Sequence, residues 1–212
     1  MDKERFLKKE MILAGSRLYQ RGLVVAKSGN LSARLDTKHI LITASGAILG
    51  RLKNKDIIKV DLGTLKYTSK RRPSSELPLH SLVHRNFPGK LIIHCHPPLI
   101  NAYFSVYDTL KVLTFETGLY LKYLPVIAQN TPTVAKPALV VAALKSNNQA
   151  VLKNHGVITI ADNFEDALGL VEALEEAVRV AAVARIFKKG ALDKLDKALK
   201  ISLAKSGPPR IS

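Results

Sequence analysis

The chain has 212 residues, of which 47% are hydrophobic, so it is long enough to bury one continuous core as a single domain over residues 1–212. Its 33 Lys and Arg residues against 17 Asp and Glu give a formal net charge of +16, which predicts anionic partners, either phosphorylated metabolites or nucleic acid. The composition argues against long disordered segments, and the sequence shows neither a signal-peptide pattern nor a run of about 18 apolar residues. We therefore expect a cytoplasmic protein without a membrane partner, and the single cysteine, Cys95, agrees with a reducing compartment.

The spacing of apolar residues predicts alternating helices and strands. A first amphipathic helix covers residues 3–21, with Asp2 as its N-cap and Gly22 at its end. Strands are predicted over residues 24–25, 31–35, 39–43, 57–61, 65–68, 91–95, 111–115 and 125–128, with 57–61 and 65–68 as a hairpin and two more strands within 150–161. Further helices are predicted between Pro73 and Pro88, over residues 99–106 and over residues 133–145. This alternation indicates the mixed α/β class, with helices covering a sheet.

The last predicted helix runs from Phe164 to Phe187. Asp162 as N-cap and Glu165 three residues later form a capping box, and Lys188-Lys189-Gly190 is expected to end the helix. A short helix and then a loose end are expected after Gly190.

Two histidines stand two residues apart at the end of a predicted strand. Because residues i and i+2 of a strand share a face, the rings of His94 and His96 point the same way, whereas Cys95 points to the opposite face as a small buried residue. A third histidine, His155, lies in a polar break between two apolar runs, where Gly156 permits a sharp turn. Three imidazoles with an open position suit a divalent cation, although each segment alone is also explained by ordinary core or turn histidines.

Glu76 is a candidate acid/base residue at the start of a predicted helix. Taken alone, it is also explained as a first-turn carboxylate stabilised by the helix dipole. His80 and His84 follow it at i+4 and i+8, so the three side chains could line one helix face and form a competing metal site. We favour a structural or supporting role for both histidines, because a helix ending at Asn86 would leave His84 near its rim.

Three small polar turns are candidates for phosphate binding. They are Ser28-Gly29-Asn30, Thr43-Ala44-Ser45-Gly46 and Ser74-Ser75. Each offers backbone N–H groups and hydroxyl or amide donors, which can surround a phosphate, although each alone is also ordinary turn chemistry.

Together these segments resemble the class II aldolase and adducin family. The resemblance is carried by SGN at residues 28–30, T-x-SG at 43–46, PSSE-x-x-x-H at 73–80, H-x-H at 94–96 and NHG at 154–156, in the family's order. It covers roughly residues 5–187 and is greatest to the archaeal-type fuculose-1-phosphate aldolases. What the resemblance implies is a three-layer fold with a central mixed or antiparallel sheet, and a homotetramer with active sites between subunits.

The resemblance also implies roles for particular residues. Zinc, or another divalent cation such as Mn²⁺ or Co²⁺, would be bound by His94, His96 and His155, and Glu76 matches the acid/base carboxylate. The positions that match phosphate-binding residues are Gly29, Asn30, Ser45, Gly46, Ser74 and Ser75. The implied reaction is reversible cleavage of a ketose 1-phosphate into dihydroxyacetone phosphate and an aldehyde, with the metal stabilising an enediolate.

Two departures from the family's pattern affect the aldehyde side of the site. The family's proton-donating tyrosine, contributed by a neighbouring subunit, falls near Phe115, and phenylalanine has no proton to donate. Tyr120, Tyr123, Glu116 or water could replace it. The C-terminal tyrosine of the bacterial aldolases has no counterpart in residues 206–212.

Other activities are consistent with the same motifs. A pentulose-5-phosphate 4-epimerase of the same family uses the same bond cleavage, whereas the methylthioribulose-1-phosphate dehydratases that resemble this chain lack a glutamate at position 76. A non-enzymatic protein, either adducin-like or binding nucleic acid, is the alternative from another class. The three histidines disfavour it, and no specific nucleic-acid motif accompanies the positive charge.

Overall fold

The structure, a computed structural model, describes residues 2–121 and 123–205, with side chains as far as Lys188. Its helices are α1 (Lys3–Gln20), η1 (Leu49–Arg51), η2 (Asn54–Asp56), α2 (Leu77–Asn86), α3 (Pro98–Val106), α4 (Phe115–Tyr120), α5 (Pro137–Leu144) and α6 (Phe164–Lys205). Its strands are β1 (Asn30–Arg34), β2 (His39–Thr43), β3 (Ile57–Asp61), β4 (Leu91–Cys95), β5 (Val126–Ala128), β6 (Gln149–Lys153) and β7 (Gly156–Ala161). A loose end was predicted to close the tail after Gly190, and the last residues of that tail, 206–212, lie outside the described residues.

The named strands form one mixed sheet in the order β3-β2-β1-β4-β7-β6-β5. Neighbouring strands are antiparallel except β5 and β6, which are parallel. The predicted α/β class with a mixed central sheet is therefore confirmed. In the register of β1 and β4, Asn30 lies opposite His94, so two candidate site residues are neighbours in the middle of the sheet.

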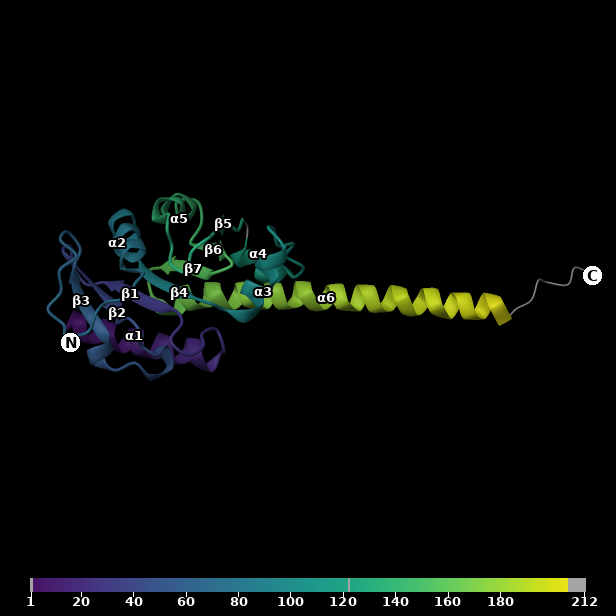
Figure 1. Ribbon diagram of the computed structural model, residues 1–212, viewed down its shortest axis with the longest axis horizontal. Coiled ribbons are helices and arrows are strands. Elements are labelled where there is room, and N and C mark those ends of the chain that lie inside the picture. The colour runs from purple at the N-terminus through teal and green to yellow at the C-terminus, as the bar shows by residue number, and fades with distance from the viewer. Residues whose placement is uncertain (1, 122, 206–212) are drawn as a thin grey trace, which may run out of the picture.

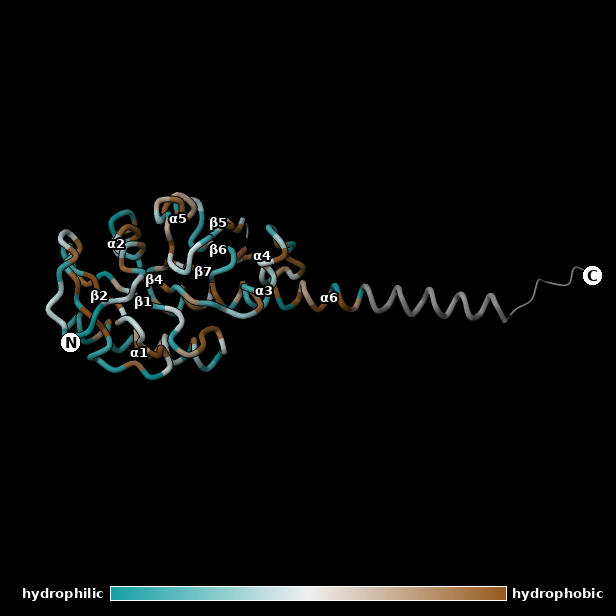
Figure 2. Tube along the Cα trace, in the orientation of Figure 1, coloured by the Kyte–Doolittle hydropathy of each residue, from teal (hydrophilic) through white to brown (hydrophobic). Residues whose placement is uncertain are grey.

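Helices cover both faces of this sheet and give three layers (Figure 1). On one face α1 and α6 bury a core that includes Leu18 and Ile93, and on the other α2 and α5 bury a second core that includes Val83 and Ile92. Successive strand residues point to opposite faces, so β4 serves both cores. Figure 2 shows hydrophobic segments where strands and helices pack together. No helix within the described residues is long and apolar enough to cross a membrane.

The ends of the first helix are as predicted. The carboxylate of Asp2 accepts a hydrogen bond from the N–H of Glu4, and Gly22 follows the C-cap with a φ of +69°, a conformation that glycine adopts readily. The last helix begins at Phe164 as predicted, but the residue that caps it is displaced by one position. Asn163, and not Asp162, exchanges hydrogen bonds with Asp166, because Asp162 instead forms an ion pair with Lys90.

Three predicted strands are absent. Residues 65–68 do not pair as a hairpin, because Leu65 has a φ of +59° and the carboxylate of Asp61 holds the preceding turn through Thr64. Val24 lies in a bend, and the carbonyl of Val25 accepts from the N–H of Ser28 at 2.9 Å, so neither residue belongs to a strand. Residues 111–115 have an alternating pattern, but Leu113 and Phe115 are exposed and α4 begins at Phe115. A strand needs a hydrogen-bonding neighbour, which the local sequence does not reveal.

The last helix also continues beyond its predicted end. The backbone of α6 passes through Gly190 without interruption and reaches Lys205, well outside the body of the molecule (Figure 1). One glycine in a helix costs only about 1 kcal/mol relative to alanine, and strong helix formers flank it here.

Candidate active site

Three histidine rings converge beside the middle of the sheet. His94 lies in β4, His96 just follows that strand, and His155 lies in the turn between β6 and β7. The Nε2 atom of His94 lies 3.1 Å from Nε2 of His96 and 3.2 Å from Nε2 of His155. A tetrahedral site with metal–nitrogen distances of about 2.0–2.1 Å separates two ligand nitrogens by about 3.3 Å. The three imidazoles could therefore hold a divalent cation.

The protonation of these rings also suits a cation. Burial lowers the pKa of His94 well below its ordinary value, and burial together with the nearby His155 lowers the pKa of His96 to about 4. Burial lowers the pKa of His155 too. The Nδ1 atom of His94 lies 3.0 Å from the carbonyl oxygen of Val157, to which it donates, so Nε2 is left with its lone pair. Metal ligation requires such neutral imidazoles.

The turn that carries His155 differs in detail from its prediction. The residue with a positive φ is Asn154, at +63°, and not Gly156. Glycine is needed at 156 because a β-carbon there would lie 2.3 Å from the carbonyl oxygen of Cys95 and 2.6 Å from the ring of His96. Gly156 thus allows β7 to lie close to the end of β4, which brings His155 to the other two rings.

Glu76 is buried beside this cluster. Its Oε1 atom lies 4.0 Å from Nε2 of His155, and both of its oxygens accept from the N–H of Val134, at 3.2 and 3.3 Å. Glu76 is the N-cap residue of α2, but its carboxylate does not bond to the helix backbone. Burial raises the pKa of Glu76, and the hydrogen bond from Val134 partly opposes this shift. The carboxylate therefore faces the site and can exchange a proton there.

Two serine-containing turns are fastened to one another next to Glu76. The N–H of Ser45 donates to the carbonyl of Arg72 at 2.9 Å, and the N–H of Ser74 donates to the carbonyl of Thr43 at 2.9 Å. These two N–H groups are occupied within the protein and are not available to a ligand. They instead fix the spacing of the turns, so the hydroxyl groups remain as donors.

Further contacts of the turns set the direction of those hydroxyls. Ser74 Oγ accepts from the N–H of Glu76 at 3.2 Å, so its own proton can be donated elsewhere. Arg71 donates to the carbonyl of Ser45 at 3.4 Å and forms an ion pair with Asp56. The guanidinium of Arg71 therefore supports the turns from outside.

One cavity of about 130 Å³ joins all these elements. Its lining includes each predicted site residue: Gly29, Asn30, Ser45, Gly46, Ser74, Ser75, Glu76, His94, His96 and His155. The lining also includes Lys27, which the sequence reasoning missed although it directly precedes the Ser28-Gly29-Asn30 turn. Val134, which holds the Glu76 carboxylate, was missed as well, because nothing in the sequence pairs two residues 58 positions apart.

His80 and His84 do not join the metal cluster. Among the described residues, the group that could hold a metal consists of His94, His96 and His155. His84 is fully buried, so the prediction that it lies near the rim of the helix is wrong. Both rings instead hydrogen bond to Ser32, and His80 also contacts Asn30.

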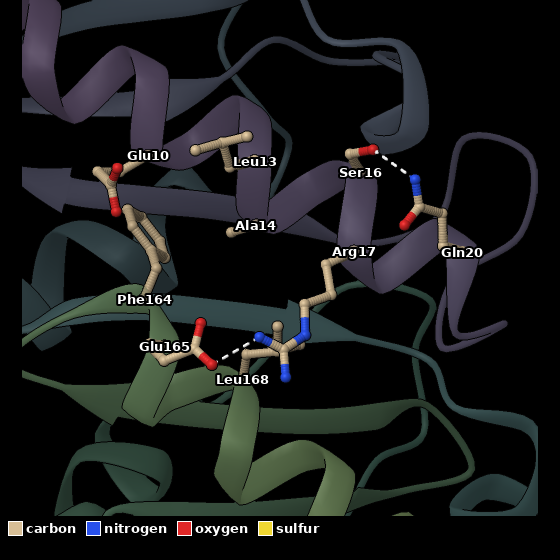
Figure 3. Close-up of a pocket in the computed structure, with 9 residues that line it drawn as sticks. All are labelled: Glu10, Leu13, Ala14, Ser16, Arg17, Gln20, Phe164, Glu165 and Leu168. Atoms are coloured by element: carbon tan, nitrogen blue, oxygen red, sulfur yellow. Dashed lines mark hydrogen bonds and ion pairs between the residues drawn. The ribbon is translucent and has the colours of Figure 1, made fainter.

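A larger cavity, of about 370 Å³, lies between α1 and the start of α6 (Figure 3). Arg17 crosses it and forms ion pairs with Glu165 and Glu172. Its lining contains no histidine and no predicted site residue. The smaller cavity is therefore the candidate active site.

Comparisons with known proteins agree with this choice. Residues 9–182 match the family described as the class II aldolase and adducin N-terminal domain. An L-fuculose phosphate aldolase of Methanocaldococcus jannaschii is 32% identical over 190 residues, which cover 89% of this chain and 100% of that protein. A 3-oxo-tetronate 4-phosphate decarboxylase of Pectobacterium atrosepticum is 30% identical over 187 residues, which cover 85% of each chain.

A solved structure has the same fold. The L-fuculose-1-phosphate aldolase of Thermus thermophilus superposes with a TM-score of 0.77 at 28% identity, over 86% of this chain and 96% of that one.

Proposed function

The chain belongs to the class II aldolase and adducin family, and from this we propose that it is a metal-dependent aldolase acting on a ketose 1-phosphate of the fuculose 1-phosphate type. The products are dihydroxyacetone phosphate and an aldehyde. The observation that carries the proposal is one cavity that combines three converging imidazoles, a buried carboxylate and three small polar turns.

Each part of the cavity has one task. His94, His96 and His155 would hold a divalent cation, with zinc as our choice over Mn²⁺ or Co²⁺ for a set of imidazole ligands. That cation would supply a Lewis acid that polarises the ketose carbonyl. Glu76, the one carboxylate among the described residues that line the cavity, moves the proton to and from carbon 3 of dihydroxyacetone phosphate.

The phosphate lies at the other end of the cavity in this proposal. Its oxygens accept from the hydroxyl groups of Ser45, Ser74 and Ser75 and from the amide of Asn30, while Gly29 and Gly46 leave room for close approach. Phosphate binding thereby fixes the distance of the reacting carbons from Glu76 and the histidines.

The first test is exchange of a carbon-3 proton of dihydroxyacetone phosphate in heavy water, followed by NMR. Exchange that depends on a divalent metal and stops with a chelator would support the metal, the phosphate turns and Glu76 together, without any choice of aldehyde. Absence of exchange by a folded, metal-loaded protein would overturn the proposed activity.

Lys27 is expected to strengthen phosphate binding. Of the described residues in the cavity lining, Lys27 alone carries a positive charge when the histidines are neutral. We expect Lys27→Met to raise the KM of a phosphorylated substrate about three- to tenfold, with kcat within about twofold, because an exposed charge is screened. Lys38→Met, at an exposed turn outside the lining, is the control. An unchanged KM, or an equal loss in both variants, would contradict the role.

Decarboxylation of a 3-oxo-tetronate 4-phosphate, the activity named for one of the relatives, is a second candidate. Loss of CO₂ from such an acid gives the same phosphorylated three-carbon ketone. The departing CO₂, unlike the aldehyde of the aldol cleavage, needs no proton from the protein. Phe115, near the position of the family's tyrosine, is fully exposed and has no proton to donate, which favours this candidate. Release of CO₂ from the 3-oxo acid, compared with release of aldehyde from the ketose 1-phosphate, distinguishes the two; a pentulose-5-phosphate epimerase would give neither product.

The assembly and location form part of the proposal. We place the protein in the cytoplasm as a homotetramer with sites between subunits. The apolar side chains of Leu113, Phe115, Leu119 and Tyr123 are exposed on and beside α4, and exposed patches of this kind mark interaction surfaces. Sedimentation equilibrium of the wild-type protein and of Phe115→Ser tests the assembly, since a tetramer built on this surface should be weakened by the substitution.

A further inference from the structure

A chain of three buried hydrogen bonds links the far side of α2 to the cavity. His84 Nε2 lies 2.8 Å from Ser32 Oγ, which lies 2.6 Å from His80 Nδ1, and His80 Nε2 lies 2.5 Å from Asn30 Oδ1. The two histidines are four residues apart on α2, and Asn30 and Ser32 are two apart on β1, so each pair shares one face of its element. All four residues are buried, and of these only Asn30 lines the cavity.

The donors of this series of hydrogen bonds can point in only two directions. Burial lowers the pKa of both His80 and His84 to about 3, so each ring is neutral at neutral pH, with one N–H donor and one acceptor nitrogen. The serine hydroxyl donates once within the chain and accepts once. The donors therefore all point from His84 toward Asn30, or all point from Asn30 toward His84.

His84, at the end of the hydrogen-bond series away from the cavity, decides between these directions. His84 Nδ1 is buried and has no hydrogen-bond partner among the described residues. If the donors pointed toward His84, this atom would carry a buried N–H without an acceptor, which native proteins rarely tolerate. If the donors point toward Asn30, the same atom carries only an unused lone pair. The arrangement in which the donors point toward Asn30 therefore has the smaller cost in free energy.

From this we propose that His84, Ser32 and His80 are positioning residues that hold the side-chain oxygen of Asn30 against α2 and turn its NH₂ group into the cavity. The proposal rests on the proposed function only in naming a phosphate as the group that this NH₂ meets. The consequence is that Asn30 presents a hydrogen-bond donor to the cavity, for an anion, and withholds the oxygen that could bind a cation. Asn30 lies opposite His94 in the sheet, so an oxygen turned inward would offer a ligand to the cation. The hydrogen-bond chain buries that oxygen and leaves a donor that attracts an anion.

The direction of the hydrogen bonds can be measured without any enzymatic assay. In metal-loaded protein with ¹⁵N-labelled histidine, solid-state NMR should find Nδ1 unprotonated and Nε2 protonated in both His80 and His84. Spectra of His84→Gln and His80→Gln assign the two signals. A protonated Nδ1 in either ring would overturn the proposal, whatever reaction the enzyme catalyses.

Substitution of Asn30 tests the group that faces the cavity. With inorganic phosphate as the probe in calorimetry, Asn30→Ala should weaken binding about tenfold through loss of one charge-assisted hydrogen bond. Asn30→Asp should weaken it further, because a second carboxylate oxygen replaces the NH₂ group. Equal or tighter binding by Asn30→Asp than by Asn30→Ala would mean that the group at this position does not meet the anion, and it would overturn the proposal.

Ser32→Ala interrupts the chain without touching the cavity. We expect the KM of the phosphorylated substrate to rise two- to fivefold, of the size of one net hydrogen bond, with kcat and bound metal unchanged. A loss of kcat or metal with an unchanged KM would show that Ser32 serves only the packing of α2 on the sheet, against the proposal.

Discussion

His94→Ala is expected to remove bound metal and activity together. His94 is the central ring of the cluster, with Nε2 atoms of both other histidines within 3.2 Å, so its loss leaves two ligands where three converged. Lewis-acid stabilisation supplies several kcal/mol of catalysis, and each 1.36 kcal/mol is tenfold in rate, so kcat/KM should fall by at least about 10³-fold. Metal content by mass spectrometry after dialysis and kcat/KM are measured on the same preparation.

Two controls separate loss of metal from loss of fold. His39→Ala removes a histidine of β2 whose ring, among the described residues, hydrogen bonds with Asp36, and the variant should retain metal and activity. In the wild-type protein added zinc should raise the melting temperature, since a ligand that binds the folded state stabilises it. In His94→Ala that increase should be absent. A folded His94→Ala protein that still binds one metal per chain and remains active would refute the assignment of the ligands.

Glu76→Gln is expected to keep the metal and lose proton transfer. The amide has the shape of the carboxylate but cannot take up a proton, and positioned acid–base groups contribute about 10²–10⁴-fold to the rate. The exchange of dihydroxyacetone phosphate in heavy water should therefore fall by that factor, while metal content stays at the wild-type level. The acid limb of the kcat/KM profile, where the wild-type activity falls as the carboxylate is protonated, should also disappear.

Glu175→Gln is the matched control. Glu175 is also a buried carboxylate whose pKa is raised by burial, and it accepts from the N–H groups of Leu99 and Ile100 at the start of α3. It does not line the active-site cavity. Glu175→Gln should change thermal stability more than exchange. Full exchange activity in Glu76→Gln, or an equal loss in both variants, would remove the assigned role from Glu76.

Local sequence was most informative where chemistry depends on short spacing. The i and i+2 positions of His94 and His96 on a strand give both rings one face whatever the rest of the chain does, and Cys95 indeed lies on the opposite face with the core of α1 and α6. The N-cap of α1 was readable for the same reason, since Asp2 needs only the N–H of Glu4.

Predictions were weaker where one element depends on another far along the chain. The alternation of residues 111–115 resembles a strand, but within the described residues no strand pairs with this segment, and its apolar side chains Leu113 and Phe115 are exposed. Gly190 resembles a stop, yet the helix of which it is part continues, because a single glycine is a small penalty. In the same way His84 was expected at a rim, and packing of α2 on the sheet buries it.

The sequence by itself determined the family, the mixed α/β class and the predicted site residues that line the cavity, because short motifs and hydrophobic periodicity are local properties of the chain. Only the tertiary structure decided that His155 reaches the other two rings through the close approach at Gly156, that Val134 holds Glu76, and that Lys27 lines the cavity. The physical reason is that these contacts join residues whose separation along the chain carries no signal. They exist only once the sheet register and the packing of α2 have brought the segments together.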